Sequence, residues 1–359
     1  MRGNKGEWSE LYAFFKLLAD GKLFSADENL NQTDSFVQIV SIQRGDSGKK
    51  LNFKLTEGSS INIIDGDSDK IILSFPQSKA EEIARNLVNE ITGKTGISEG
   101  LKKTIQKLKI TQVAQKSQSK GDINILIYDP IHCISSDQKF SIKSFLGSDP
   151  TLFNANKTTN IIYRIIDSSN NPITEKHLNE VNDINTGHKY INRIAKLSEL
   201  GYSIKFDSFE DDTFKLNLHV IDSDLPKIIA HIVLDKYVSK ITRITDVIKK
   251  IKTDNPMNYD LSQGHKFYEY RIVNFLVEVA LGMTSKVVWS GKYDVVGGII
   301  IVKPDAGLLC YHLIDFNKFK HYLKSSSRLD NPSGSRMGYG FVYMDGEESF
   351  IKLNFQIKA

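Results

Sequence analysis

Two residues that could share chemistry, Asp122 and Lys143, stand at matching places on two predicted strands. An apolar stretch predicts a strand over 122–128, and a second strand is predicted over 139–144 with Lys143 in its middle. Side chains two residues apart on a strand share a face, so Ser141 and Lys143 would both face Asp122 across a hairpin. A carboxylate there can bind Mg²⁺, which takes oxygen ligands and few of them from protein. The lysine would then orient a water molecule for attack on phosphorus.

Such a site needs a second carboxylate, and a predicted N-terminal helix offers two. Apolar residues recur at three- and four-residue spacing between about 7 and 19, which predicts a helix closed by Asp20-Gly21. Glu7 and Glu10 flank its apolar stripe. Acids in a first turn also stabilise a helix through its dipole, so each glutamate equally fits that simpler role.

The elements expected around these residues form an α/β (α+β) protein with a mixed central sheet and flanking helices. The polar stretch at 167–175 suggests two parts, 1–166 and 167–359, which could pack as one globule. Ser78 and Glu81 predict a capping box for a helix that runs to about Ile91. Strands are predicted at 36–43, 51–55, 61–64, 70–75, 160–166, 293–303, 308–315 and in a hairpin over 340–357; helices at 174–182, 186–200, 224–235, 242–252 and 264–281; and a loop over 325–340.

Composition narrows the class of protein. The 359 residues are 40% hydrophobic and 25% charged, and only two are cysteines, which excludes disordered and disulfide-rich classes. The net charge of +4 indicates no particular partner, but residues 101–120 carry six lysines and no acid. The N-terminus lacks the apolar core of a signal peptide, and the apolar stretch at 295–302 is too short to span a bilayer, so we expect a cytoplasmic protein.

The Asp122 and Lys143 pattern resembles the PD-(D/E)xK nuclease core, although Ser141 stands where that core usually has Glu or Asp. Longer segments carry a more specific resemblance, to the type II restriction endonucleases of the HpaII family, over nearly the full length. These segments are Asn4-Lys5-Gly6-Glu7-Trp8-Ser9-Glu10, the runs 140–147, 150–155, 297–303 and 309–312, Ser333-Gly334-Ser335-Arg336, and 352–357. The resemblance implies Mg²⁺-dependent hydrolysis of double-stranded DNA at CCGG, by in-line attack of metal-activated water that leaves a 5′-phosphate.

The resemblance also implies roles for individual residues. Asp122 becomes the metal ligand, Lys143 the catalytic lysine, and Glu10 the accessory acid, with Glu7 second. Arg336 could read a guanine edge or hold a phosphate, and both roles stay open. Further residues placed to contact DNA are Ser144, Thr151, Asn154, Asn160, His312, Lys102 and Lys103.

Two other functions remain as alternatives. Ser141 would mark a lost site if the chain were a catalytically inactive DNA-binding protein. Asp294 also precedes a hairpin, in which Cys310 and His312 take the acid and lysine positions, so a DNA-processing enzyme could centre there. Cys suits Mg²⁺ poorly, which favours the first hairpin. A palindromic target suggests a homodimer, and a monomer that nicks the strands in succession is the alternative.

Overall fold

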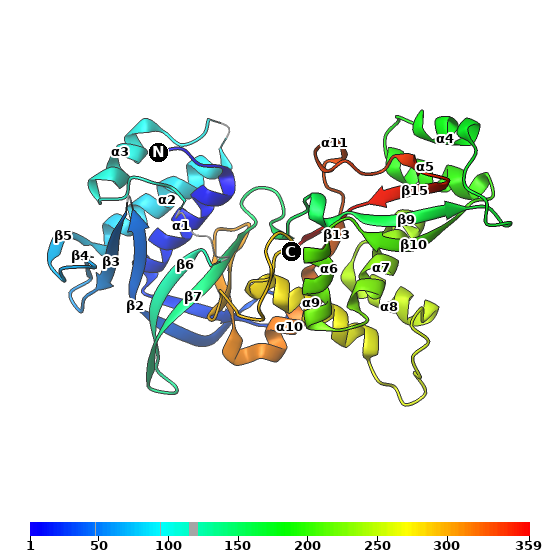
Figure 1. Ribbon diagram of the computed structural model, residues 1–359. Coiled ribbons are helices and arrows are strands. Elements are labelled where there is room, and N and C mark those ends of the chain that lie inside the picture. The colour runs from blue at the N-terminus through cyan, green and yellow to red at the C-terminus, as the bar shows by residue number, and fades with distance from the viewer. Residues whose placement is uncertain (47, 94, 115–120) are drawn as a thin grey trace. The chain divides into compact units, whose positions relative to one another are not determined.

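The computed structural model describes residues 1–46, 48–93, 95–114 and 121–359, and it divides the chain into two compact units (Figure 1). Unit 1 comprises Met1–Pro150, Ala280–Gly282 and Tyr293–Tyr322. Unit 2 comprises Thr151–Val279, Met283–Lys292 and Leu323–Ala359. The chain therefore passes between the units more than once, and the polar stretch at 167–175 lies inside unit 2.

Unit 1 is built on a mixed nine-stranded sheet in the order β1-β12-β11-β7-β6-β2-β3-β4-β5. Strand β1 pairs with β12 on one side and with β2 on the other, so six of the strands close into a barrel. Strands β3 to β5 continue from β2 as the predicted antiparallel meander. The bounds are β1 Lys22–Ala26, β2 Gln32–Asp46, β3 Lys49–Leu55, β4 Ser60–Asp65, β5 Ile71–Pro76, β6 Ile123–Asp129, β7 Ile134–Ser144, β11 Gly298–Val302 and β12 Leu308–His312.

Three helices complete most of unit 1: α1 Lys5–Asp20, α2 Gln77–Thr92 and α3 Glu99–Lys107. The predicted apolar stripe of α1 is fully buried in the core that this helix shares with α2 and the sheet. The predicted capping box at Ser78 is wrong, because Pro76 caps α2 and no side chain bonds to the free amides there. Pro76 is the last residue of strand β5, so the helix begins directly after the strand and Ser78 lies inside its first turn instead of before it.

Unit 2 has two antiparallel sheets, with the strand orders β10-β9-β15-β14 and β13-β16-β8. The predicted strand at 160–166 is β9. It pairs with β10 and β15 and therefore belongs to a different sheet from the β6–β7 hairpin. The predicted loop over 325–340 contains a short strand and a short helix. The bounds are β8 Thr151–Phe153, β9 Ile161–Ile166, β10 Ser203–Phe209, β13 Arg328–Asp330, β14 Val342–Asp345, β15 Glu348–Leu353 and β16 Gln356–Lys358, with helices α4 Glu175–Asn182, α5 Lys189–Glu199, α6 Asp212–Ile221, α7 Leu225–Ser239, α8 Ile244–Asp254, α9 Phe267–Leu281 and α11 Gly334–Met337. Helix α10, Phe316–Ser326, begins in unit 1 and ends in unit 2.

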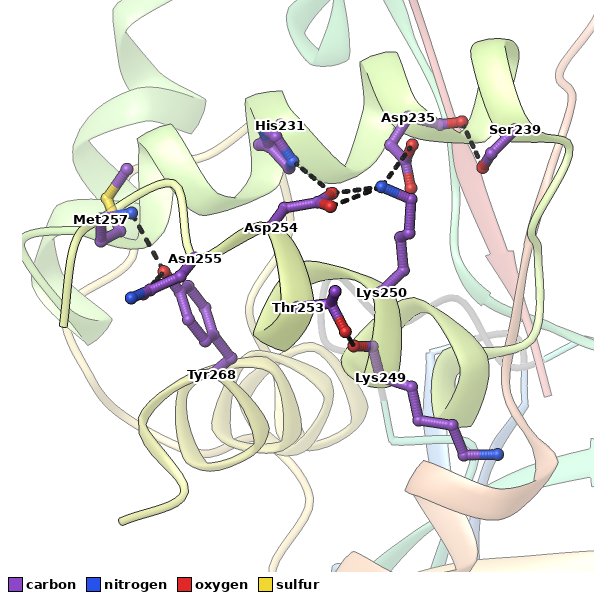
Figure 2. A network of polar contacts seen from close by, with 10 residues as sticks. All are labelled: His231, Asp235, Ser239, Lys249, Lys250, Thr253, Asp254, Asn255, Met257 and Tyr268. Carbon is purple, nitrogen blue, oxygen red and sulfur yellow. Dashed lines mark hydrogen bonds and ion pairs between the residues drawn. The ribbon is translucent and has the colours of Figure 1, made fainter. Parts of the chain in front are cut away.

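Helices α7 and α8 of unit 2 are tied together by a polar network (Figure 2). Asp254 near the end of α8 accepts hydrogen bonds from Lys250 one turn earlier and from His231 on α7, the latter over 3.3 Å. Burial opposes ionisation of Asp254, but these two hydrogen bonds lower the pKa of its carboxyl below the usual range. The Lys250 ammonium also lies 3.9 Å from the carboxylate of Asp235 on α7. These contacts therefore link α7 to α8.

Within the described parts of the chain, every helix is too short or too polar to cross a membrane.

Candidate active site

The β6–β7 hairpin of unit 1 brings Asp122, Ser141 and Lys143 together. Ile123 lies opposite Phe140 in the antiparallel register, which places Asp122 across from Ser141. The Asp122 carboxylate accepts hydrogen bonds from the Ser141 hydroxyl over 3.1 Å and from the Ile142 backbone amide over 2.6 Å. The Lys143 ammonium donates to the same hydroxyl over 2.8 Å. Ser141 is 2% exposed, so its hydroxyl links the acid and the lysine away from bulk water.

Glu10 of α1 belongs to the same electrostatic environment. Burial, and then the negative charge of Asp122, raise the pKa of Glu10 to about 7. The positive charges of Lys143 and Arg44 oppose this shift. The effect of the Asp122 charge on Glu10 requires the two side chains to lie near each other, because such coupling falls off with distance. The N-terminal helix and the hairpin therefore deliver the two acids to one place.

Glu7 has a different environment. Its carboxylate accepts a hydrogen bond from the Asn4 backbone amide over 2.8 Å, and the Asn4 side chain accepts one from the Glu7 amide over 3.1 Å. This reciprocal pair is a capping box at the start of α1. The structure thus uses Glu7 to begin the helix, and Glu10 is the acid that interacts with the hairpin.

Arg44 on β2 is a residue of this region that the sequence did not single out. It is 4% exposed and donates hydrogen bonds to the backbone carbonyls of Gln112 and Val113, over 2.7 and 2.6 Å. Burial lowers the pKa of its guanidinium to about 10, and its charge acts on Glu10. Arg44 lies within the alternating pattern of β2, and this could have indicated a buried arginine. The predicted strand ended at residue 43, one residue before it.

The donor set fits a cation with few protein ligands. The described residues contain no group of three or more His, Cys, Asp or Glu side chains placed to hold a metal. Asp122 and Glu10 supply two oxygen donors whose mutual repulsion a divalent cation would relieve. Mg²⁺ commonly binds through one or two carboxylates together with substrate phosphates, so two are enough.

Residues expected to contact DNA are divided between the units. In unit 1, Ser144 accepts from the Leu146 amide over 3.2 Å, Lys102 pairs with Glu99 over 2.6 Å, and Lys103 is exposed on α3. The other lysines of the basic segment include Lys116 and Lys120, which lie outside the described residues.

In unit 2, Asn154 and Arg336 are exposed, and the Thr151 hydroxyl accepts from Lys358 over 2.8 Å. Asn160 is 1% exposed, and its amide nitrogen donates to the Glu210 carboxylate and to the Met337 carbonyl. Burial leaves this side chain no surface to offer to a phosphate, so its role is internal.

The second hairpin does not assemble an equivalent site. His312 is 8% exposed, with its Nε2 2.6 Å from the Gln138 side-chain oxygen and its Nδ1 accepting from the Ile314 amide over 3.1 Å. Burial lowers the pKa of His312, opposed by the charges of Asp129 and Asp315. Burial also raises the pKa of the Cys310 thiol far above its usual range. Two residues on which the alternative at Asp294 and His312 depends, Cys310 and His312, are thus buried, and the imidazole already makes internal hydrogen bonds.

The hairpin thus brings an acid, a hydroxyl and a lysine together, and a second acid is electrostatically coupled to them. Comparison with known proteins gives the family. The model of the HpaII restriction endonuclease family matches residues 4–359. The type II restriction enzyme HpaII of Haemophilus parainfluenzae is 38% identical over 360 aligned residues, which cover 99% of this chain and 98% of that enzyme. No solved structure matches.

The chain therefore belongs to the HpaII restriction endonuclease family, as the sequence predicted. It is a type II restriction endonuclease, that is, a site-specific deoxyribonuclease.

Proposed function

We propose that this endonuclease cleaves double-stranded DNA at CCGG in a Mg²⁺-dependent reaction, with a PD-(D/E)xK-type site at the β6–β7 hairpin. The observation that carries the proposal is the hydrogen-bonded series Lys143, Ser141 and Asp122, with Glu10 electrostatically coupled to it. The CCGG target follows from the family resemblance.

Asp122 and Glu10 would hold the metal together with the scissile phosphate. A bound Mg²⁺ would supply neutralisation of the charge that develops on the phosphodiester. Lys143 orients the attacking water and adds positive charge beside the phosphate. Its ammonium is held by the Ser141 hydroxyl over 2.8 Å, so its position is fixed before substrate arrives.

Ser141 takes the place of the usual acid but not its charge. Its hydroxyl donates to Asp122 and accepts from Lys143, so it orders both groups without adding a third negative charge. Glu10 then provides the carboxylate that the hairpin lacks. This division explains how a serine can stand at that position in an active enzyme.

The remaining DNA contacts are proposed for Ser144, Thr151, Asn154, Arg336, Lys102 and Lys103. A palindromic target favours a homodimer with one active site per strand. Sedimentation of the protein with a CCGG duplex checks this: two chains per duplex are expected, whereas one chain per duplex would indicate successive nicking.

Plasmid cleavage tests the proposed function. We expect discrete fragments with Mg²⁺, none with EDTA, and fragment ends that map to CCGG when sequenced. Lys143→Ala should abolish cutting while it preserves specific binding, because the lysine acts on the water and not on the base sequence. Lys54→Ala, at an exposed lysine of β3, is the matched control and should cut normally. Undiminished cutting by Lys143→Ala would overturn the site.

A further inference from the structure

The segment 331–340 of unit 2 presents an exposed arginine from a rigid frame. Ser333, Ser335 and Arg336 are exposed on and beside α11, a helix of one turn. A segment rich in Ser and Gly can adopt many conformations, and fixing its backbone in one of them costs conformational entropy. The contacts described next must offset this loss of entropy if the segment is to keep one conformation.

A tyrosine occupies the space that two glycines leave open. A Cβ atom on Gly334 would lie 1.5 Å from the Tyr190 hydroxyl oxygen, and one on Gly340 would lie 2.1 Å from the Tyr190 ring. Gly340 also has φ +85°, which side chains disfavour. The Tyr190 ring packs on Tyr339 with centroids 4.6 Å apart. The segment thus packs closely against one aromatic side chain of α5 at two places, Gly334 and Gly340.

Buried polar groups hold the backbone in addition. Asn160 donates to the Met337 carbonyl over 2.9 Å, and Arg193 donates to the Gly340 carbonyl over 2.7 Å. Each of these two side chains is 1% exposed. The Tyr339 hydroxyl donates to the Pro332 carbonyl over 2.9 Å, which joins the two ends of the segment to each other. Arg193 also donates to the carbonyls of Ile184 and Asn182, and Asn160 also donates to Glu210, so the segment is anchored to a larger buried polar network.

We propose that Arg336 is a specificity-determining residue that reads the edge of a guanine in the target, and that Tyr190 and Asn160 are the residues that position it. This inference rests on the proposed CCGG target, which offers guanines on both strands. Bidentate bonding of a guanidinium to guanine O6 and N7 demands a fixed approach, and sites of this precision are built on rigid supports. A phosphate contact tolerates a mobile lysine or arginine and would not require such a frame.

The test measures binding in the Lys143→Ala background, so that cleavage does not interfere. A CCGG duplex, the same duplex with 7-deazaguanine, and a duplex without the target are the three probes. We expect Arg336→Ala to weaken binding to CCGG by roughly 10- to 100-fold and to affect the non-target duplex little. For the parent protein, 7-deazaguanine at one or more guanine positions should weaken binding relative to the CCGG duplex. Arg336→Ala should bind the 7-deazaguanine duplex and the CCGG duplex equally well. Arg243→Ala, at an exposed arginine on another part of unit 2, is the control.

Equal losses on target and non-target DNA, with a salt slope reduced by about 1, would mean a phosphate contact and would overturn the proposal. Retained discrimination in Arg336→Ala would overturn it as well. Tyr190→Ala should lose discrimination in the same way, whereas Tyr190→Phe, which keeps the ring, should retain it. If fragment mapping gives another target, the same comparison is made there, and a target without guanine refutes the inference. A parent protein that shows no preference for any sequence refutes the proposed function itself.

Discussion

The Lys143 ammonium and the Ser141 hydroxyl are joined by a hydrogen bond of 2.8 Å, and the same hydroxyl donates to Asp122. One neutral side chain therefore sets the positions of the lysine and of the acid. Its removal tests whether this order matters for the reaction or only for the fold.

Ser141→Ala should lower the cleavage rate by roughly 10- to 100-fold, since the lysine loses the group that orients it. Single-turnover cleavage of a CCGG duplex measures the effect. Ser135→Ala, at an exposed serine of the same strand, is the control and should cut at the normal rate. Normal cutting by Ser141→Ala would show that the hydroxyl has no part in catalysis.

Glu10→Gln should lose activity and gain stability. The folded-state pKa of Glu10 is about 7, above its ordinary value of 4.5, so ionisation destabilises the fold as pH rises from below 4.5 to above 7. The variant should therefore gain about 1–3 kcal/mol over the wild type at pH 8, and nothing at pH 4. Urea unfolding at the two pH values checks this. Glu7→Gln is the comparison, and it should weaken the helix cap instead of stabilising the protein.

Cleavage should increase with pH through about 7, because a protonated Glu10 is a poor ligand. Higher Mg²⁺ concentration should move the midpoint of the profile to lower pH, since the cation binds the ionised form. Initial cleavage rates between pH 5.5 and 8.5 at two Mg²⁺ concentrations provide the measurement. A midpoint that does not respond to Mg²⁺ would assign the titration to another group.

Arg44→Met should destabilise the fold by about 2–4 kcal/mol, because the carbonyls of Gln112 and Val113 lose charged hydrogen bonds. Its loss also removes a positive charge that lowers the pKa of Glu10, so the pH profile should shift upward. Thermal unfolding and the cleavage profile together distinguish the two effects. A stable variant with an unshifted profile would contradict the interaction with Glu10.

Asp254→Asn tests the network of Figure 2 apart from the active site. Its carboxyl pKa is lowered in the fold, so its stabilising contribution is present above pH 4 and is lost as pH falls below that. We expect a loss of about 0.5–1 kcal/mol at pH 7, reduced at high salt because the group is partly exposed. DNA cleavage should be unchanged. An effect on cleavage without an effect on stability would give the network another role.

Local patterns predicted the elements that carry the site, because each depends on nearby residues. The spacing of Leu11, Phe14 and Phe15 predicts α1, and alternation predicts the β6–β7 hairpin, with Ser141 and Lys143 facing Asp122. Closure of the sheet into a barrel depends on β1 pairing with β12 across nearly three hundred residues, and no local pattern encodes that pairing.

Similar limits apply to single residues. Glu7 and Glu10 are alike in sequence, and only the packing of α1 against the sheet shows which is coupled to Asp122. Asn160 follows the hairpin in sequence, but the chain enters unit 2 before reaching it, where its side chain is buried. Polarity and proximity in sequence do not reveal burial.

Barrel closure has a consequence for how the catalytic strands can move. In an open sheet, an outer strand can fray from its end and release its neighbours in turn. Strands β6 and β7 instead belong to a closed ring of six strands, and the free edge of the sheet lies at β5, five strands away from β7. Lys143 lies in the part of β7 that pairs with β11, so displacing its backbone requires breaking the β7–β11 pairing of the ring. Backbone amides of β7 between 140 and 144, where β7 pairs with β11, should therefore exchange with solvent more slowly than those of β5, which exchange by local opening.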